Sequence, residues 1–187
     1  QTCEWNAAHA EEACSLATEM EEFVFLRAHA MSLLMQRGYS SADILQDEQR
    51  YVPQRVRHRV AKQAQSRCGY CLTTELLSGT KMEIEHIIPS ALGGSSEEDN
   101  LWLACSLCNE YKGVRIVGPD PLTGIFEPLF NPRQQAWEDH FVWTDDFERI
   151  VGRTATGRAT VAALRLNRPL LVRSRRIWAT TGLHPPG

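Results

Sequence analysis

Two Cys-x-x-Cys pairs, Cys68/Cys71 and Cys105/Cys108, are the feature that most constrains the fold of this chain. Each pair can present two thiolates to one tetrahedral Zn²⁺, and this spacing is typical of zinc sites and not of a disulfide framework. Four sulfur ligands leave no coordination position open for a reaction. The pairs therefore predict a structural zinc site, and any chemistry has to be carried by the residues between them.

Composition indicates a globular protein without a membrane segment. Of the 187 residues, 43% are hydrophobic, which is enough for a sizeable core. The apolar runs are too short to span a bilayer, and the first residues lack the pattern of a signal peptide. We expect no membrane association and, because zinc-binding thiols must stay reduced, a cytoplasmic location. Cys3 and Cys14 are interpreted as ordinary thiols.

The net charge of -3 is distributed unevenly. Residues 1–50 hold 9 acids and 3 bases, giving -6, whereas residues 51–187 hold 14 acids and 17 bases, giving +3. A basic remainder suits contact with phosphate, although solvated helix faces are the competing interpretation for any one arginine. The bases cluster at Arg55, Arg57, Arg59, Lys62 and Arg67, and again at Arg165, Arg168, Arg173, Arg175 and Arg176.

Residues 1–52 are predicted to form an acidic, helical extension. Apolar residues recur at helical spacing between residues 11 and 36, and Ser41 is a suitable N-cap for a second, shorter helix. The extension has three interpretations that the sequence leaves open. In the first the extension covers the rest of the protein, in the second it mediates self-association, and in the third it binds a protein partner.

Residues 53–118 are predicted to form the core around the zinc site. We expect a basic helix over residues 54–66, strands over 81–84 and 101–104, and a helix over 106–112 that Gly113 ends. Gly93 and Gly94 mark the long connection between the two strands as a loop.

Residues 119–187 are predicted to form a mixed, mainly helical C-terminal part. Turn residues indicate an irregular stretch first, then a helix over 132–140 that Asn131 caps. Short strands at 141–143 and 150–151, helices at 159–167 and 170–178, and a loose tail follow. The fold class expected for the whole chain is α+β.

The segment between the cysteine pairs resembles the HNH endonuclease family. The match consists of Glu85-His86, Asn100 and Asn109, set inside the four cysteines over about residues 67–113. This resemblance implies a ββα-metal core held by a Cys₄ zinc site. Residues 120–133 and 156–160 are similar to the C-terminal part of a group of small bacterial HNH proteins, which supports the same family.

The residue types fit phosphodiester hydrolysis. His86, with an ordinary pKa near 6.5, is a suitable general base for an attacking water. Glu85 and Asn109 offer oxygen ligands, which favour Mg²⁺ or Mn²⁺, although Asn109 could instead cap its helix. We expect Asn100 to hold the loop that carries His86 through backbone hydrogen bonds. Four basic residues are candidates for contact with nucleic acid: Arg57, Lys62, Lys112 and Arg115.

The sequence therefore predicts a metal-dependent endonuclease of HNH type that acts on DNA, with double-stranded DNA as the expected substrate. Zn²⁺ would be structural and Mg²⁺ or Mn²⁺ catalytic. One alternative is a non-catalytic, zinc-stapled module that binds nucleic acid. Another is a nuclease subunit of a larger defence or mobile-element complex.

Overall fold

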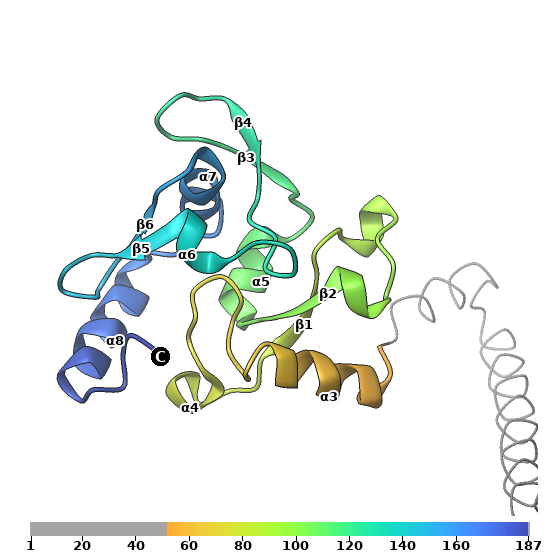
Figure 1. The fold of residues 1–187 in the computed structure, drawn as a ribbon, viewed down its shortest axis with the longest axis horizontal. Helices are drawn as coiled ribbons and strands as arrows, with labels where there is room; N and C mark the ends of the chain where they lie inside the picture. Colours follow the sequence, from red (N-terminus) through yellow and green to blue (C-terminus); the bar gives the residue numbers. More distant parts are fainter. Residues whose placement is uncertain (1–51, 187) are drawn as a thin grey trace, which may run out of the picture. The chain divides into compact units, whose positions relative to one another are not determined.

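A computed structural model describes residues 52–186, which contain helices and three two-stranded antiparallel sheets (Figure 1). This mixture confirms the predicted α+β class. The helices expected within residues 1–51 lie outside the described part of the chain, as do Cys3 and Cys14. Within residues 52–186, no helix is long and apolar enough to cross a membrane.

The first half of this region surrounds one strand pair. Its elements are α3 (Gln54–Gln63), α4 (Glu75–Ser78), β1 (Glu83–His86), two 3₁₀ turns (Ser90–Leu92 and Glu98–Asn100), β2 (Leu101–Ala104) and α5 (Ser106–Lys112). Strands β1 and β2 pair in antiparallel register, with Glu85 opposite Trp102 and His86 opposite Leu101.

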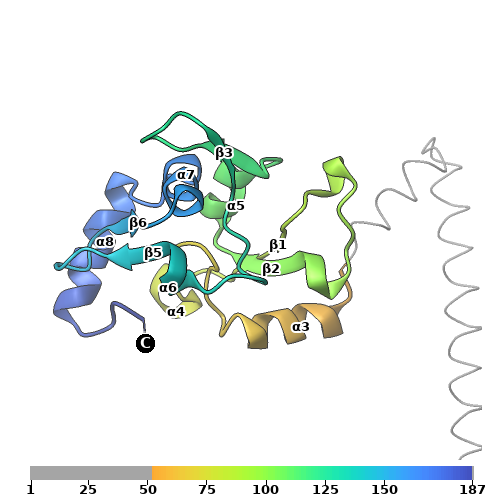
Figure 2. The same cartoon turned by 45° about the horizontal axis from the view of Figure 1, so that its top comes forward.

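Helices α3 and α5 lie on opposite faces of the β1–β2 pair (Figures 1 and 2). Successive side chains of a strand point to opposite faces, so the alternation along β1 and β2 separates two sets. Leu101 and Leu103 pack with the buried Val60 of α3. Glu83 and Glu85 point to the α5 side of β1, where they contact side chains of α5. The α5 side of β1 therefore carries both carboxylates.

The second half of the region adds two hairpins and two longer helices. Its elements are β3 (Val117–Pro119), β4 (Phe126–Pro128), α6 (Trp137–His140), β5 (Phe141–Trp143), β6 (Ile150–Gly152), α7 (Ala155–Ala163) and α8 (Pro169–Thr180). Thr154 caps α7, because its hydroxyl accepts a hydrogen bond from the Gly157 N–H at 3.0 Å.

Most of the predicted elements are present, with four main differences. Strand β1 begins and ends two residues later than expected, and α7 begins four residues earlier. The helix predicted over 132–140 covers only Trp137–His140, because Asn131 is held in a turn through its bonds with Arg133 and Gln135. The short hairpin of β3 and β4 was not predicted, because the turn residues in this stretch indicated irregular structure.

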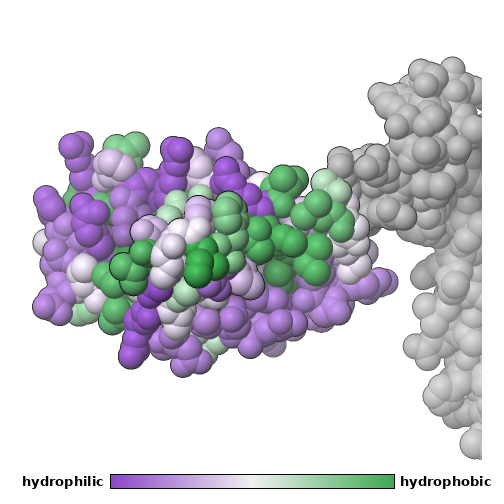
Figure 3. All heavy atoms as spheres, turned by 90° about the horizontal axis from the view of Figure 1, so that it is seen from above, coloured by the Kyte–Doolittle hydropathy of each residue, from purple (hydrophilic) through white to green (hydrophobic). Residues whose placement is uncertain are grey.

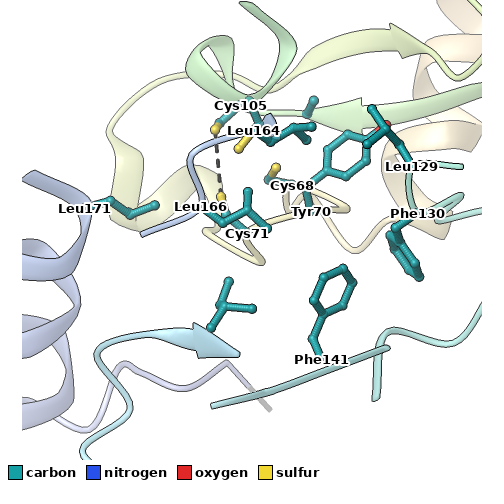
Figure 4. Packing of buried hydrophobic residues seen from close by; sticks show 13 residues of the cluster. Cys68, Tyr70, Cys71, Cys105, Leu129, Phe130, Phe141, Leu164, Leu166 and Leu171 are labelled. Carbon is teal, nitrogen blue, oxygen red and sulfur yellow. Dashed lines mark hydrogen bonds between the residues drawn. The ribbon is translucent and has the colours of Figure 1, made fainter. Parts of the chain in front are cut away.

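One apolar core joins the two halves. The four cysteines and Tyr70 pack in the same buried cluster as Leu129, Phe130, Phe141, Ile150 and Leu164 (Figure 4). Residues 53–118 and 119–187, which we expected to be separate regions, thus bury part of their apolar surface against each other.

The β3–β4 hairpin is attached to α7 by a polar contact. Arg158 donates to both carboxylate oxygens of the buried Asp120, at 2.8 and 2.7 Å, and this guanidinium lowers the pKa of Asp120 to about 2. The outer side of the hairpin exposes apolar side chains, which include Leu122, Ile125 and Phe126. Figure 3 shows apolar residues gathered on the face seen from above in Figure 1, the side on which this hairpin lies.

Candidate active site and metal centre

The four cysteines of the two pairs meet in one buried cluster. None of them forms a disulfide, and their sulfur atoms all lie within 4.8 Å of one another. The Sγ atoms of Cys71 and Cys105 are 3.8 Å apart (Figure 4). Four sulfurs at the usual Zn–S length stand about 3.8 Å apart along the edges of a tetrahedron. The donor set and its spacing therefore fit one tetrahedral metal ion such as zinc.

Local structure places each pair of cysteines. The first pair lies in a tight turn in which the Gly69 N–H donates to the Leu103 carbonyl at 2.8 Å. A Cβ on Gly69 would come within 2.3 Å of the Trp102 ring, so only glycine allows this approach to β2. In the second pair, Cys105 is the N-cap of α5 and Cys108 lies in its first turn. Strand β2 and helix α5 thus set the second pair against the first.

The close packing of the four thiols shifts their pKa values. Hydrogen bonding to Cys105 lowers the pKa of Cys71, whereas burial raises the pKa of Cys68. Because a metal ion binds thiolates, its binding has to release the protons that remain on such a cluster. The occupancy of this site by zinc should therefore depend on pH.

His86 ends strand β1 and is only partly buried. Its Nε2 atom lies 3.0 Å from the Ser96 hydroxyl, across the loop that joins β1 to β2. Its backbone carbonyl accepts a hydrogen bond from the Lys112 ammonium at 2.9 Å. The ring is thus held at the end of β1, where part of it is exposed to solvent.

Asn100 makes the backbone hydrogen bonds that the sequence led us to expect. Its Oδ1 atom accepts from the Ile88 N–H at 2.8 Å, and its Nδ2 donates to the carbonyls of Ile88 and Ser95 at 2.9 and 2.8 Å. These bonds close the loop that follows His86. Gly94 lies inside the loop, where a Cβ would come within 1.8 Å of the Ile88 carbonyl oxygen.

Glu85 and Lys112 form a buried ion pair. The Lys112 Nζ lies 2.5 Å from the Glu85 Oε1, and each side chain is only 2% exposed. Burial raises the pKa of Glu85, and the Lys112 charge partly offsets this shift. Lys112 was a candidate for contact with nucleic acid, but the structure turns its ammonium inward. The pair holds the end of β1 against α5.

Asn109 contacts a carboxylate that sequence reasoning did not single out. Its Nδ2 donates to the Glu83 Oε2 at 2.6 Å, and this contact lies at the surface. The strand period of two placed Glu83 on the same face as Glu85, and that signal could have identified it. Three oxygen-bearing side chains, from Glu83, Glu85 and Asn109, thus lie on the α5 side of β1.

The other basic candidates lie at the surface. Arg57 and Lys62 are exposed on α3, and Arg115 is exposed just after α5. Arg115 donates to the Tyr111 carbonyl, and the Arg165 guanidinium lies 5.0 Å from the centre of the Tyr111 ring. One residue of α5 thus meets two arginines, Arg115 at its backbone and Arg165 at its ring.

The fold and site define a small α+β domain with a four-cysteine cluster spaced for a metal ion and a histidine at a strand end. Residues 68–115 match the family model described as HNH endonuclease, which confirms the resemblance inferred from the sequence over this segment. HNH domains are typically nucleases, and the matched segment contains the four cysteines. Comparisons with curated proteins and with solved structures gave no match.

Proposed function

We propose that this protein is a metal-dependent endonuclease of HNH type that hydrolyses phosphodiester bonds in DNA, with double-stranded DNA as the main substrate. The observation that carries the proposal is His86, which lies within the HNH match, stands partly exposed at the end of β1 and is followed by a loop that Asn100 closes. This arrangement presents an imidazole on a rigid support, as a general base requires.

His86 would act as the base that activates water. An imidazole can take up a proton near neutral pH, so a ring nitrogen of His86 would accept a proton from the attacking water. The water oxygen then forms a bond to phosphorus, and the bond from phosphorus to the 3′ oxygen breaks. The products would be a 5′-phosphate and a 3′-hydroxyl, with the leaving oxygen taking up a proton.

Glu85 and Asn109 are the proposed ligands of a catalytic Mg²⁺ or Mn²⁺, and Glu83 is a further donor next to Asn109. When bound, such a cation neutralises charge on the phosphate and stabilises the leaving oxygen. Because Lys112 engages Oε1 of Glu85, this carboxylate would have to use its other oxygen or release the lysine. The four cysteines would hold a structural Zn²⁺.

The decisive experiment compares plasmid cleavage by the wild type and by His86→Ala in Mg²⁺ and in Mn²⁺. Loss of a general base should lower the cleavage rate by roughly 10²-fold or more. His58→Ala, which removes an exposed histidine from α3, is the matched control and should cleave normally. Circular dichroism and zinc content would show that each variant is folded. Cleavage by His86→Ala at the wild-type rate would disprove the assignment.

A second candidate function is supported by the burial of Glu85. A carboxylate that is 2% exposed and paired with a lysine suits a structural role, as in a zinc-stapled module that binds nucleic acid without cutting it. Substitutions of Glu83 and Glu85 by glutamine separate the two functions. If the protein is a nuclease, at least one of them should raise the Mg²⁺ concentration needed for cleavage. DNA binding with no cleavage of any substrate would favour the module.

A further inference from the structure

Arg168, at the N-terminus of α8, contacts two cysteines of the metal cluster. Its Nη1 atom lies 3.8 Å from the Cys108 sulfur and its Nη2 lies 3.7 Å from the Cys105 sulfur, and both contacts have hydrogen-bond geometry. The two arms of one guanidinium thus reach both sulfurs of the second Cys-x-x-Cys pair. This arginine comes from a segment about 60 residues further along the chain, outside the HNH match.

Arg175, two turns later on α8, is a second arginine without a carboxylate partner among the described residues, and it is fully buried. It has no exposed surface, and its guanidinium lies 4.8 Å from the centre of the Trp143 ring. One arm donates to the Glu148 carbonyl at 3.2 Å, but its Nε and Nη2 atoms are buried without a hydrogen-bond partner. Burial lowers the pKa of Arg175 to about 10, and the sulfurs of Cys71 and Cys108 oppose that shift.

These two cations have no acidic partner in the part of the chain that the structure describes. Within residues 52–186, the ion pairs between carboxylates and basic side chains involve Arg59, Lys112, Arg158 and Arg176. A charge removed from water without a counter-charge is costly, and Arg168 is partly buried with its guanidinium against two sulfurs. Zn²⁺ bound by four thiolates carries a formal charge of about -2, which the Arg168 guanidinium would partly balance.

We infer that Arg168 is a counter-charge of a metal–tetrathiolate centre and donates N–H···S hydrogen bonds to the thiolates of Cys105 and Cys108. Helix α8 thereby completes the metal centre, although it lies outside the matched segment. The pairing presupposes that the four cysteines hold zinc, as proposed above. Donors to a ligand atom stabilise its charged form, so Arg168 should tighten metal binding.

The test measures zinc affinity in the full chain by competition with a chromophoric zinc chelator. Arg168→Gln removes the charge at similar size and should weaken zinc binding about 10- to 100-fold. Arg168→Lys keeps the charge but loses the two-armed contact, and should recover part of that loss. Arg173→Gln, an exposed arginine on the same helix, is the matched control and should bind zinc within about twofold of the wild type.

A spectroscopic measurement separates this role from a general effect on folding. With Co²⁺ in place of zinc, loss of the N–H···S bonds should shift the sulfur-to-cobalt charge-transfer bands to lower energy, whereas Arg173→Gln should leave them unchanged. Arg168→Lys provides this measurement even if Arg168→Gln does not fold.

The possible results distinguish a failure of the Arg168 pairing from a failure of the zinc site itself. A wild-type protein that binds no zinc would disprove both. If the wild type binds one zinc ion, and the folded Arg168 variants show its affinity and its cobalt spectrum unchanged, the pairing is wrong and the zinc site stands. Weakened binding with shifted bands, confined to the Arg168 variants, supports the pairing.

Discussion

At the scale of single residues, Lys112 shows how far a tertiary contact can change the role expected of a side chain. A lysine near the end of a short helix is usually exposed, and the sequence offered it as a contact for phosphate. The structure instead pairs it with Glu85 at 2.5 Å and with the His86 carbonyl at 2.9 Å. It thus connects α5 to the residue proposed as base and to a residue proposed as metal ligand.

Removing one partner of this buried pair should be strongly destabilising. We expect Lys112→Met to lower the free energy of unfolding by about 3–5 kcal/mol, because the Glu85 carboxylate would remain buried without its counter-charge. Urea denaturation measures the change. Lys62→Met, on the exposed face of α3, should change stability by less than about 0.5 kcal/mol.

A double variant tests the cause of that loss. Adding Glu85→Gln to Lys112→Met removes the unpaired charge and should restore part of the stability. If the double variant is as unstable as the sum of the two single variants, the two side chains do not interact energetically, and the loss has another origin.

At the scale of elements, the loop between β1 and β2 depends on a close backbone approach. Asn100 bonds to both backbone groups of Ile88, and Gly94 fits against the Ile88 carbonyl. We expect Gly94→Ala to push this loop away from Asn100, to lower stability and to reduce the cleavage rate of the folded protein. Plasmid cleavage together with thermal unfolding measures both effects.

The neighbouring glycine is the matched control for this loop. Gly93 has a φ of +81° but no atom within 4 Å of a Cβ, so Gly93→Ala should cost only about 1–2 kcal/mol of backbone strain. Equal cleavage by the two alanine variants would show that the contact of Gly94 with Ile88 does not position the site.

The same scale shows which elements local sequence could predict. Strand β2 and helix α5 have the expected bounds, because Asn100, Cys105 and Gly113 mark their ends locally. Strand β1 is shifted by two residues, since its bounds are set by pairing with β2. The β3–β4 hairpin has strands of three residues, and its attachment depends on Arg158 about 40 residues away. No local pattern could indicate that contact.

At the scale of the whole molecule, the four cysteines that would hold zinc lie inside the core that joins both halves of the described region. We therefore expect a strong zinc chelator to unfold residues 52–186, because metal binding and folding are coupled in such sites. Omission of Mg²⁺ from the buffer should stop cleavage and leave the fold intact.

Thermal unfolding followed by circular dichroism measures these two effects separately. The apoprotein should lose its cooperative transition, whereas the Mg²⁺-free protein should keep the melting temperature of the untreated sample. An apoprotein that melts as the holoprotein does would contradict a structural role for the metal.

The sequence by itself determined where the metal ligands and the candidate base would be. Two Cys-x-x-Cys turns and a strand–loop–strand–helix order are local signals, and they are sufficient to bring four sulfurs together. The tertiary structure alone decided which charges face one another. Lys112 pairs with Glu85, Asn109 meets Glu83, and Arg168 reaches the cysteine sulfurs across about 60 residues. Such pairings depend on how separate elements pack, and spacing along the chain does not encode them.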